Sequence, residues 1–392
     1  MGRSVIVAGS RTAIGKLSGV LGSQRAVDLG AVAIRATLDR AGVAPEAVDA
    51  VIMGQVLQAG TGQITARQAA AGAGIPLSVH ATTIDKVCLS GLQSLYLADL
   101  MVRAGDARVV IAGGMESMTN APYLLPGARA GYRYGDQTVV DSLQFDGLTC
   151  AFDHCAMGLA TEKFMEGRLS RQRQDEFAAR SHERAAAATA QGLFTDEIVP
   201  VSIAQRKGDP VVVTSDEGIR AQTTVEALAG LRPAFDAAGT ITAGNASQIS
   251  DGAAALLVVD AALADELGLE VLGELVSYGQ VAGPDTSLLL QPANAIRQAL
   301  ARADVDLSAV DLFEINEAFA AVALASTDEL GVDPEKVNPL GGAIALGHPI
   351  GMSGTRLALT ALHQLRQRGG GLAAVALCGG GGQGDGALLR VR

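Results

Sequence analysis

Cys88 stands in a stretch whose residue types suit nucleophilic chemistry. It is followed by Leu89-Ser90-Gly91 and then by apolar residues three to four positions apart, which places Cys88 at the start of a helix. Unsatisfied backbone N–H groups and the helix dipole would stabilise a thiolate there and lower the thiol pKa below its free value of about 8.5. Free cysteines are also often buried and inert. This stretch alone leaves both interpretations open.

The second half of the chain supplies groups that could activate such a thiol. His348 lies in a loop rich in glycine and proline, Cys378 stands where an apolar strand meets a run of glycines, and Asn316 precedes both. A cysteine nucleophile needs a base and the base needs an orienting group, so separated Cys, His and Asn positions are typical of a nucleophilic site. A cysteine hydrolase would use the same three residue types. It would leave Cys378 without a role.

The elements that must position these residues alternate between strand and helix. From the hydrophobic periodicity we expect helices at residues 26–41 and 66–71 and strands at residues 5–8, 51–53 and 108–114. This alternation predicts an α/β domain whose sheet is rich in parallel strands and carries helices on its faces.

Part of the first half recurs in the second half. Residues 33–49 align with residues 295–311, and ten of the 17 aligned positions are identical. Ser90-Gly91, followed by a helix and a strand, is echoed by Ser353-Gly354 with the same elements after it. Two amphipathic helices can resemble each other by chance, but the shared order of several elements favours one domain present twice. Such a duplication can bring loops that are distant in sequence to one shared centre.

With these residues in place, the chain resembles the thiolases. The motifs of that family occur in order, as CLSG from Cys88, NEAF from Asn316, GHPIG from Gly347 and CGGGGQG from Cys378. The resemblance covers nearly the whole chain. It implies an α/β, thiolase-like fold in which two duplicated αβα-type halves form five layers. Residues 1–117 with about 251–270 would form the first half, residues 118–250 an inserted loop domain, and residues 271–392 the second half.

The resemblance also implies a two-step acyl transfer. Cys88, activated by His348, would become acylated, and Cys378 would act as the acid and base on the second substrate. Asn316 would hold a water that, with His348, binds the thioester oxygen, while the backbone N–H groups of Cys88 and Gly380 would form a second oxyanion hole. This would explain the glycine run around Gly380, because only glycine would let the backbone point that donor into so tight a space. Two acetyl-CoA would condense to acetoacetyl-CoA and CoA, and the reverse reaction would cleave a 3-ketoacyl-CoA.

In thiolases the insertion binds coenzyme A and carries a tetramerisation loop, which residues 121–141 resemble. From the residues alone, the basic cluster of Arg206, Lys207, Arg220 and Arg232 would be a solvated face. The resemblance assigns Arg220 to the nucleotide phosphates. Contacts with the acyl-CoA are expected from Leu148, Met157, Arg220, Phe235, Ala243, Ser247, Ala318 and Phe319. The expected partners are acetyl-CoA, acetoacetyl-CoA and CoA, in a homotetramer.

Beyond these CoA thioesters no cofactor is implied, and no metal is expected. Cys150, Asp153, His154 and Cys155 lack the paired spacing of a structural zinc site.

Two positions depart from the short-chain members of the family. Leu89 follows the nucleophile where a small residue is usual, and Ala156 occupies a position where histidine is usual. A degradative 3-ketoacyl-CoA thiolase of broader chain length is therefore the alternative. A ketoacyl synthase would lack the second catalytic cysteine, and a non-catalytic acyl-CoA-binding relative would have lost Cys88 or His348.

Composition restricts the partners and the compartment. The 392 residues include 30 basic and 41 acidic side chains, and a net charge of −11 argues against a general surface for nucleic acid or anionic membranes. No apolar stretch is long enough to span a bilayer, and the N-terminal apolar run is too short for a secretory signal. Four cysteines without a regular framework fit a reducing compartment. We therefore expect a soluble cytoplasmic protein.

Overall fold

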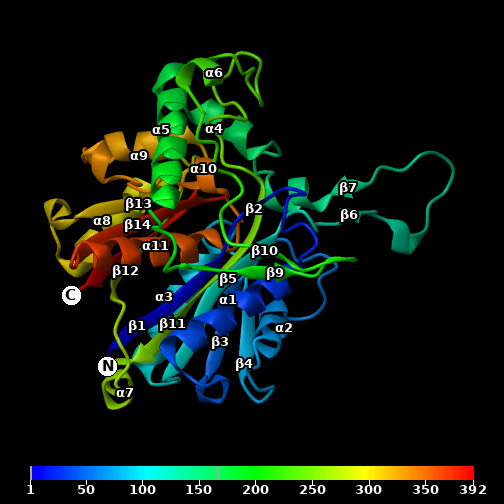
Figure 1. Ribbon diagram of the computed structural model, residues 1–392. Coiled ribbons are helices and arrows are strands. Elements are labelled where there is room, and N and C mark those ends of the chain that lie inside the picture. Colours follow the sequence, from blue (N-terminus) through cyan, green and yellow to red (C-terminus); the bar gives the residue numbers. More distant parts are fainter. Residues whose placement is uncertain (1, 166) are drawn as a thin grey trace.

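A computed structural model describes residues 2–165 and 167–392 as five stacked layers of helix and sheet (Figure 1). Two sheets alternate with three layers of helices. The first outer layer contains α1 (Ala26–Ala41) and α2 (Thr65–Gly72), the central layer α3 (Ser90–Ala104) and α11 (Ser353–Gln367), and the second outer layer α8 (Gln291–Ala303) and α9 (Ala320–Leu330).

The first sheet has the strand order β4-β3-β5-β11-β1-β8, and β2 pairs with β11. The strands are β1 (Ser4–Thr12), β2 (Gly15–Lys16), β3 (Ala50–Gly54), β4 (His80–Ile84), β5 (Val109–Ser117), β8 (Ile198–Val199) and β11 (Ser250–Asp260). β3 runs parallel to β4 and β5, whereas β11 runs antiparallel to both β5 and β1. The expected strands and helices are present, but the sheet is mixed. β11 returns from the long insertion and enters the sheet from the opposite end.

The second sheet repeats this topology with the order β12-β15-β14-β13. Its strands are β12 (Glu274–Ala282), β13 (Leu312–Ile315), β14 (Gly371–Gly379) and β15 (Gln383–Val391). β13 is parallel to β14, and β15 is antiparallel to β14 and β12. This is the arrangement of β3, β5, β11 and β1. The similarity between residues 33–49 and 295–311 therefore reflects one α/β unit present twice.

The central helices α3 and α11 meet at their N-terminal glycines. A Cβ at Gly354 would collide with the backbone nitrogen of Leu92, and a Cβ at Gly91 would lie 2.8 Å from the backbone nitrogen of Thr355. Glycine at these positions allows the helix starts to come into direct contact. Leucines and alanines from both helices and both sheets fill the rest of this central layer. As a result, the loop before α3 and the loop before α11 are held together.

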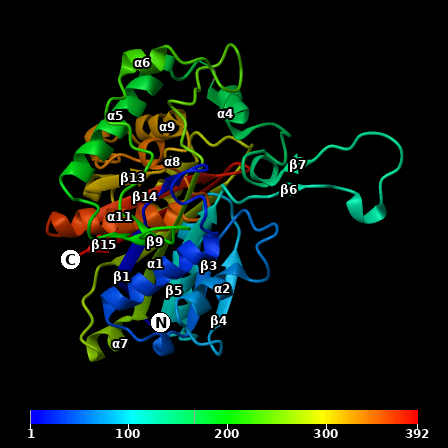
Figure 2. The same cartoon turned by 45° about the vertical axis from the view of Figure 1, so that its right-hand side comes forward.

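The insertion lies mainly above the second sheet in Figure 1 and contributes most of the remaining elements. They are β6 (Tyr123–Leu124), β7 (Val140–Asp141), α4 (Met157–Met165), α5 (Arg171–Ala190), β9 (Val201–Ile203), β10 (Val211–Val213) and α6 (Val225–Ala229). Two short helices, α7 (Ala261–Glu266) and α10 (Ala343–Leu346), lie in the two halves. The β6–β7 hairpin extends away from the body in both views (Figures 1 and 2). Across the described residues, no helix has the length and apolar character to cross a membrane.

Candidate active site

Cys88 lies in the turn between β4 and α3, directly before the helix as the sequence predicts. Val87 adopts a left-handed conformation with φ of 50°, which is unusual for a β-branched residue. Its N–H donates to Asp85 Oδ1 at 2.8 Å, and its carbonyl accepts from Ser90 Oγ at 2.7 Å. Ser90 Oγ also accepts from the N–H of Lys86 at 2.8 Å. These contacts hold the strained turn that presents Cys88.

The expectation of a lowered pKa for Cys88 is wrong for this structure. Burial raises the pKa of the thiol to about 12, and the carboxylates of Asp85 and Glu116 add to the increase, while the N–H of Cys88 itself opposes it. The cost of removing a thiolate from water therefore exceeds the stabilisation that the helix start provides. Cys88 is a neutral thiol in the resting site, and it needs a base close by.

His348 is placed to act as that base. Its Nε2 lies 3.3 Å from Cys88 Sγ, and its Nδ1 lies 2.5 Å from Ser353 Oγ. The hydroxyl of Ser353 donates to the carbonyl of Pro349 at 2.8 Å, so Ser353 Oγ is an acceptor for Nδ1–H. This arrangement leaves the lone pair on Nε2 facing the thiol. Burial, with a smaller effect from Arg356, lowers the pKa of His348 to about 3, so the imidazole is neutral.

Ser353 is a site residue that the sequence analysis did not identify. Its position in the Ser-Gly pair that starts α11 was noted only as part of the duplication. A hydroxyl five residues after a histidine carries no recognisable signal until the fold brings the two together.

Asn316 lies beside His348 at the end of β13. Its Nδ2 is 3.4 Å from His348 Nε2, and its backbone N–H donates to the carbonyl of Ala376 at 2.9 Å. The side chain is fully buried, and among the described residues its Oδ1 has no hydrogen-bond partner. A buried amide oxygen without a protein partner is suited to bind a further small molecule such as water.

Cys378 lies at the buried end of β14, directly before the glycine-rich turn. Burial raises the pKa of its thiol, and the nearby Cys88 raises it further. Gly380 follows in the turn and faces Val87, the residue before the nucleophile. The fold therefore brings the second cysteine and the glycine turn to the Cys88 loop.

Within the glycine run around Gly380, the need for glycine does not fall on Gly380 itself. A Cβ there would lie 3.6 Å from the Val87 side chain, which is an ordinary contact. The constraint falls instead on Gly381 and Gly382, with φ of 78° and 73°. A Cβ at Gly382 would also collide with the carbonyl oxygen of Asp285. These two glycines make the turn that brings the N–H of Gly380 next to the nucleophile loop.

A cavity of ≈ 470 Å³ opens beside His348 and has mainly apolar walls. Seven of the eight residues expected to contact the acyl-CoA line it: Leu148, Met157, Arg220, Phe235, Ala243, Ser247 and Phe319. The eighth, Ala318, lies behind the wall, where its carbonyl accepts from the N–H of Ser247 at 3.0 Å. Wall residues that the sequence analysis missed include Lys16, Met118, Gln248, Ile249 and Ile350.

Of the predicted basic cluster, only Arg220 lines this cavity. Its backbone N–H donates to His182 Nδ1 at 3.1 Å. Burial, and then the positive charge of Arg220, lower the pKa of His182 to about 4, so the ring is neutral and can accept this bond. Arg206 and Lys207 lie in the exposed loop between β9 and β10. They stand apart from the cavity wall, so the cluster is not one surface.

A second cavity has a volume of ≈ 580 Å³. Val87, Phe152 and Gly380 line it, and Met157 lines both cavities. Cys150 also lines it. Cys150 Sγ lies 3.2 Å from Asp153 Oδ2, and the described part of the chain contains no group of three or more His, Cys, Asp or Glu placed to hold a metal ion.

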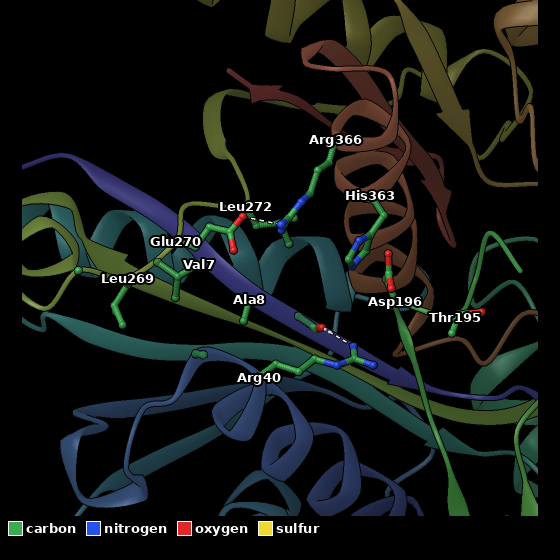
Figure 3. Close-up of a pocket in the computed structure, with 13 residues that line it drawn as sticks. Val7, Ala8, Arg40, Thr195, Asp196, Leu269, Glu270, Leu272, His363 and Arg366 are labelled. Atoms are coloured by element: carbon green, nitrogen blue, oxygen red, sulfur yellow. Dashed lines mark hydrogen bonds and ion pairs between the residues drawn. The ribbon is translucent and has the colours of Figure 1, made fainter.

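Figure 3 shows a further cavity, of ≈ 500 Å³, whose lining includes no motif residue. Its guanidinium groups are already paired. Arg366 binds Glu270, and Arg40 donates to the backbone carbonyl of Gly9 at 2.8 Å. Asp196 balances part of the remaining charge, so this cavity shows no net preference for an ionic ligand.

Two family models and several full-length relatives match this chain. Residues 4–262 match the thiolase N-terminal domain, and residues 269–391 match the thiolase C-terminal domain. The chain is 59% identical over 387 residues to a probable acetyl-CoA acetyltransferase of Mycolicibacterium smegmatis, covering 98% of this chain and 100% of that protein. It is 51% identical to an acetyl-CoA acetyltransferase of Cupriavidus necator, covering 97% of each. It is 48% identical to a probable acetyl-CoA acyltransferase of Staphylococcus aureus, covering 99% of each. The chain belongs to the thiolase family.

Proposed function

We propose that this protein is an acetyl-CoA C-acetyltransferase, which condenses two acetyl-CoA to acetoacetyl-CoA and CoA and catalyses the reverse cleavage. The names of its full-length relatives support this activity. The observation that carries the mechanism is the contact of 3.3 Å between Cys88 Sγ and the unprotonated Nε2 of His348. A neutral thiol and a neutral imidazole at this distance form a nucleophile and its general base.

In the first step His348 takes the proton of Cys88 as the sulfur attacks the thioester carbonyl of acetyl-CoA. The oxyanion that forms accepts hydrogen bonds from the backbone N–H groups of Cys88 and Gly380. When the carbonyl re-forms, the C–S bond to coenzyme A breaks, and His348 returns its proton to the leaving thiolate. The product is S-acetyl-Cys88 and free CoA.

In the second step Cys378 passes its proton to His348, which is neutral again, and the resulting thiolate removes a proton from the α-carbon of a second acetyl-CoA. The carbanion attacks the carbonyl of acetyl-Cys88, a C–C bond forms, and the Cys88 thiolate leaves and takes the proton held by His348, so that both cysteines end as thiols and His348 as a neutral imidazole. The enolate oxygen of the second acetyl-CoA is stabilised by His348 and by a water held on Asn316. Cys378 is itself buried, so this step requires the substrate to bind before the thiol gives up its proton.

The acyl-CoA would lie in the cavity beside His348. Its apolar wall at Met157 and Phe319 suits the pantetheine arm, and Arg220 at the exposed side suits a phosphate of the nucleotide. The wall comes largely from the insertion. We therefore assign residues 118–250 to CoA binding and oligomerisation, between a first half of residues 1–117 with about 251–270 and a second half of residues 271–392.

The assembly we propose is a homotetramer in the cytoplasm, where CoA thioesters are available and thiols stay reduced. The extended β6–β7 hairpin carries exposed large side chains, among them Tyr123, Leu125, Tyr132, Tyr134 and Val139. Large apolar groups on a protruding hairpin mark a surface that another subunit can cover. Acetyl-CoA and acetoacetyl-CoA connect such an enzyme to fatty acid metabolism.

Mass spectrometry after incubation with acetyl-CoA tests the nucleophile. We expect an added acetyl group on the tryptic peptide that contains Cys88 and its loss when CoA is added back. Acetylation found only on another residue would refute the mechanism. Steady-state cleavage of acetoacetyl-CoA in the presence of CoA tests the activity itself, and a wild-type protein without this cleavage would overturn the proposed function.

A further inference from the structure

Lys86 and Asp385 form an ion pair that neither the motifs nor the mechanism uses. Lys86 Nζ lies 2.8 Å from each carboxylate oxygen of Asp385 and 3.0 Å from Gln93 Oε1. The Asp385 side chain is 1% exposed and the Lys86 side chain 21%. Burying two charges is costly unless they are well paired and hydrogen-bonded, as they are in this pair.

A polar network completes the pair. The hydroxyl of Tyr278 donates to Asp385 Oδ2 at 2.8 Å, and the amide of Gln280 donates to Gln93 Oε1 at 2.8 Å. Tyr278 is buried and stacks on Tyr96 of α3 with 4.3 Å between the ring centres. The network therefore connects α3 of the first half with β12 and β15 of the second half.

The two charged residues sit next to the two cysteine loops. Lys86 is two positions before Cys88, in the turn where Val87 takes its left-handed conformation. Asp385 pairs with Leu377 across the β14–β15 hairpin, directly beside the pair of Cys378 with Gly384. The ion pair thus joins the turn that carries the nucleophile to the hairpin that carries the second cysteine and Gly380.

Such a link bears on catalysis because the proposed oxyanion hole takes one donor from each half. The N–H of Cys88 belongs to the first half and the N–H of Gly380 to the second, and no backbone hydrogen bond between these two loops fixes their spacing among the described residues. A misplacement of about 1 Å at a catalytic centre can cost about 10²-fold in rate. A strained turn also holds its shape only where surrounding contacts enforce it.

We propose that the Lys86–Asp385 ion pair is a positioning device that sets the spacing between the Cys88 turn and the Cys378–Gly380 hairpin. This inference rests on the proposed function for its effect on catalysis. Neither residue is expected to touch the substrate. The pair acts through the two loops that do.

The test measures cleavage of acetoacetyl-CoA by Lys86→Met, by Asp385→Asn, by the double variant and by the wild type. Each rate is divided by the amount of Cys88 that can be alkylated, so that only folded sites are counted. We expect each single change to lower kcat about 10²-fold, while KM stays within threefold because the CoA cavity is untouched. The double variant removes both charges, so no unpaired buried charge remains, and its thermal midpoint should recover toward that of wild type. Its kcat should stay low.

A second readout does not depend on activity. Dibromobimane bridges two neighbouring thiols, and peptide mapping measures the yield of the Cys88–Cys378 bridge. We expect this yield to fall at least threefold in Lys86→Met. If the wild-type protein forms the bridge but shows no cleavage activity, the proposed function is refuted. If the bridging yield is nevertheless lower in Lys86→Met, the positioning role of the ion pair still holds. A double variant with kcat and bridging yield within threefold of wild type would show that the pair only stabilises the fold.

Arg103→Met is the matched control. Arg103 Nη1 lies 3.4 Å from Asp99 Oδ2, in an ion pair at the far end of the same helix α3, where Asp99 is 4% exposed. Breaking this pair should leave kcat and the bridging yield unchanged. An equal loss in Arg103→Met would mean that any damage to α3 impairs the site, and it would overturn the specific role of Lys86 and Asp385.

Discussion

His348 Nδ1 lies 2.5 Å from Ser353 Oγ, while the Ser353 hydroxyl donates to the carbonyl of Pro349. The two bonds fix the tautomer of the imidazole and direct its lone pair to Cys88. Ser353→Ala removes the acceptor for Nδ1–H, so the ring can turn and take the other tautomer. A hydrogen bond of about 1.4 kcal/mol corresponds to a tenfold effect, and we expect kcat/KM for acetoacetyl-CoA cleavage to fall by at least that factor.

Thr360→Val is the control for this change. Thr360 lies on the same helix, and its buried Oγ1 has no partner in the part of the chain that the structure describes. Removing that hydroxyl should leave the rate unchanged. A Ser353→Ala enzyme with wild-type kcat/KM would show that the imidazole is oriented by other contacts.

Cys378→Ser should separate the two steps of the reaction. A serine hydroxyl is a far weaker acid than a thiol and cannot serve as the base for an α-carbon. Condensation and thiolysis should therefore fall by about 10³-fold or more, while S-acetyl-Cys88 still forms on incubation with acetyl-CoA. Cys155→Ser, which changes a partly exposed thiol that lines neither cavity, should behave as wild type. Condensation at the wild-type rate in Cys378→Ser would remove Cys378 from the mechanism.

The pH dependence of the acylation step follows from the two pKa shifts at the Cys88–His348 pair. Burial lowers the pKa of His348 to about 3, so the imidazolium is present only below that value. Burial raises the pKa of Cys88 to about 12, so the thiolate is present only above it. Between these limits both groups are neutral and competent. The rate of acetyl transfer to Cys88, measured by release of CoA in a rapid-mixing experiment, should be flat from pH 5 to 9.

The neutral pair would be contradicted if the acylation rate changed with pH at an apparent pKa of about 6.5 or 8.5, which are the values of free histidine and free cysteine.

The sequence predicts the motif residues and the duplicated fold because both depend on local patterns. Cys88, His348, Asn316 and Cys378 carry chemistry that few residue types can perform, and the repeat keeps the hydrophobic periodicity of each element. The mixed character of the first sheet was not predictable in this way. The direction of β11 depends on where the chain leaves the insertion, and no local periodicity records that.

The electrostatics of the site depend on tertiary burial and were therefore beyond the sequence. The start of a helix favours a thiolate, but the protein packed around the partly exposed Cys88 limits the hydration that a thiolate needs, and this desolvation has the larger effect on its pKa. The arginine cluster is a similar case. Arg206 and Arg220 are near in sequence, yet one lies in an exposed loop and the other lines the cavity.

The oligomeric state can be tested at the β6–β7 hairpin. Deleting its tip removes exposed Tyr132 and Tyr134, so light scattering should show a shift from tetramer to dimer without loss of the folded state. Shortening the loop between β9 and β10 is the control and should leave the mass unchanged. A wild-type protein that is already a dimer at working concentration, and is unaffected by the deletion, would exclude a role for the hairpin in assembly.

Ala156 gives the last prediction, which concerns the length of the acyl chain. It lines the cavity beside His348, next to Met157, which lines both this cavity and the second one. A methyl group in place of an imidazole leaves apolar room, and each buried methylene is worth only about 0.8 kcal/mol.

We therefore expect acetoacetyl-CoA to be cleaved and 3-ketohexanoyl-CoA to be accepted within about tenfold in kcat/KM, the ratio that ~1.4 kcal/mol represents. Ala156→His should reduce the longer substrate more than the shorter one. A kcat/KM for acetoacetyl-CoA more than about a hundredfold below that for substrates of eight or more carbons, a difference of ~2.7 kcal/mol, would instead identify a degradative thiolase for long chains.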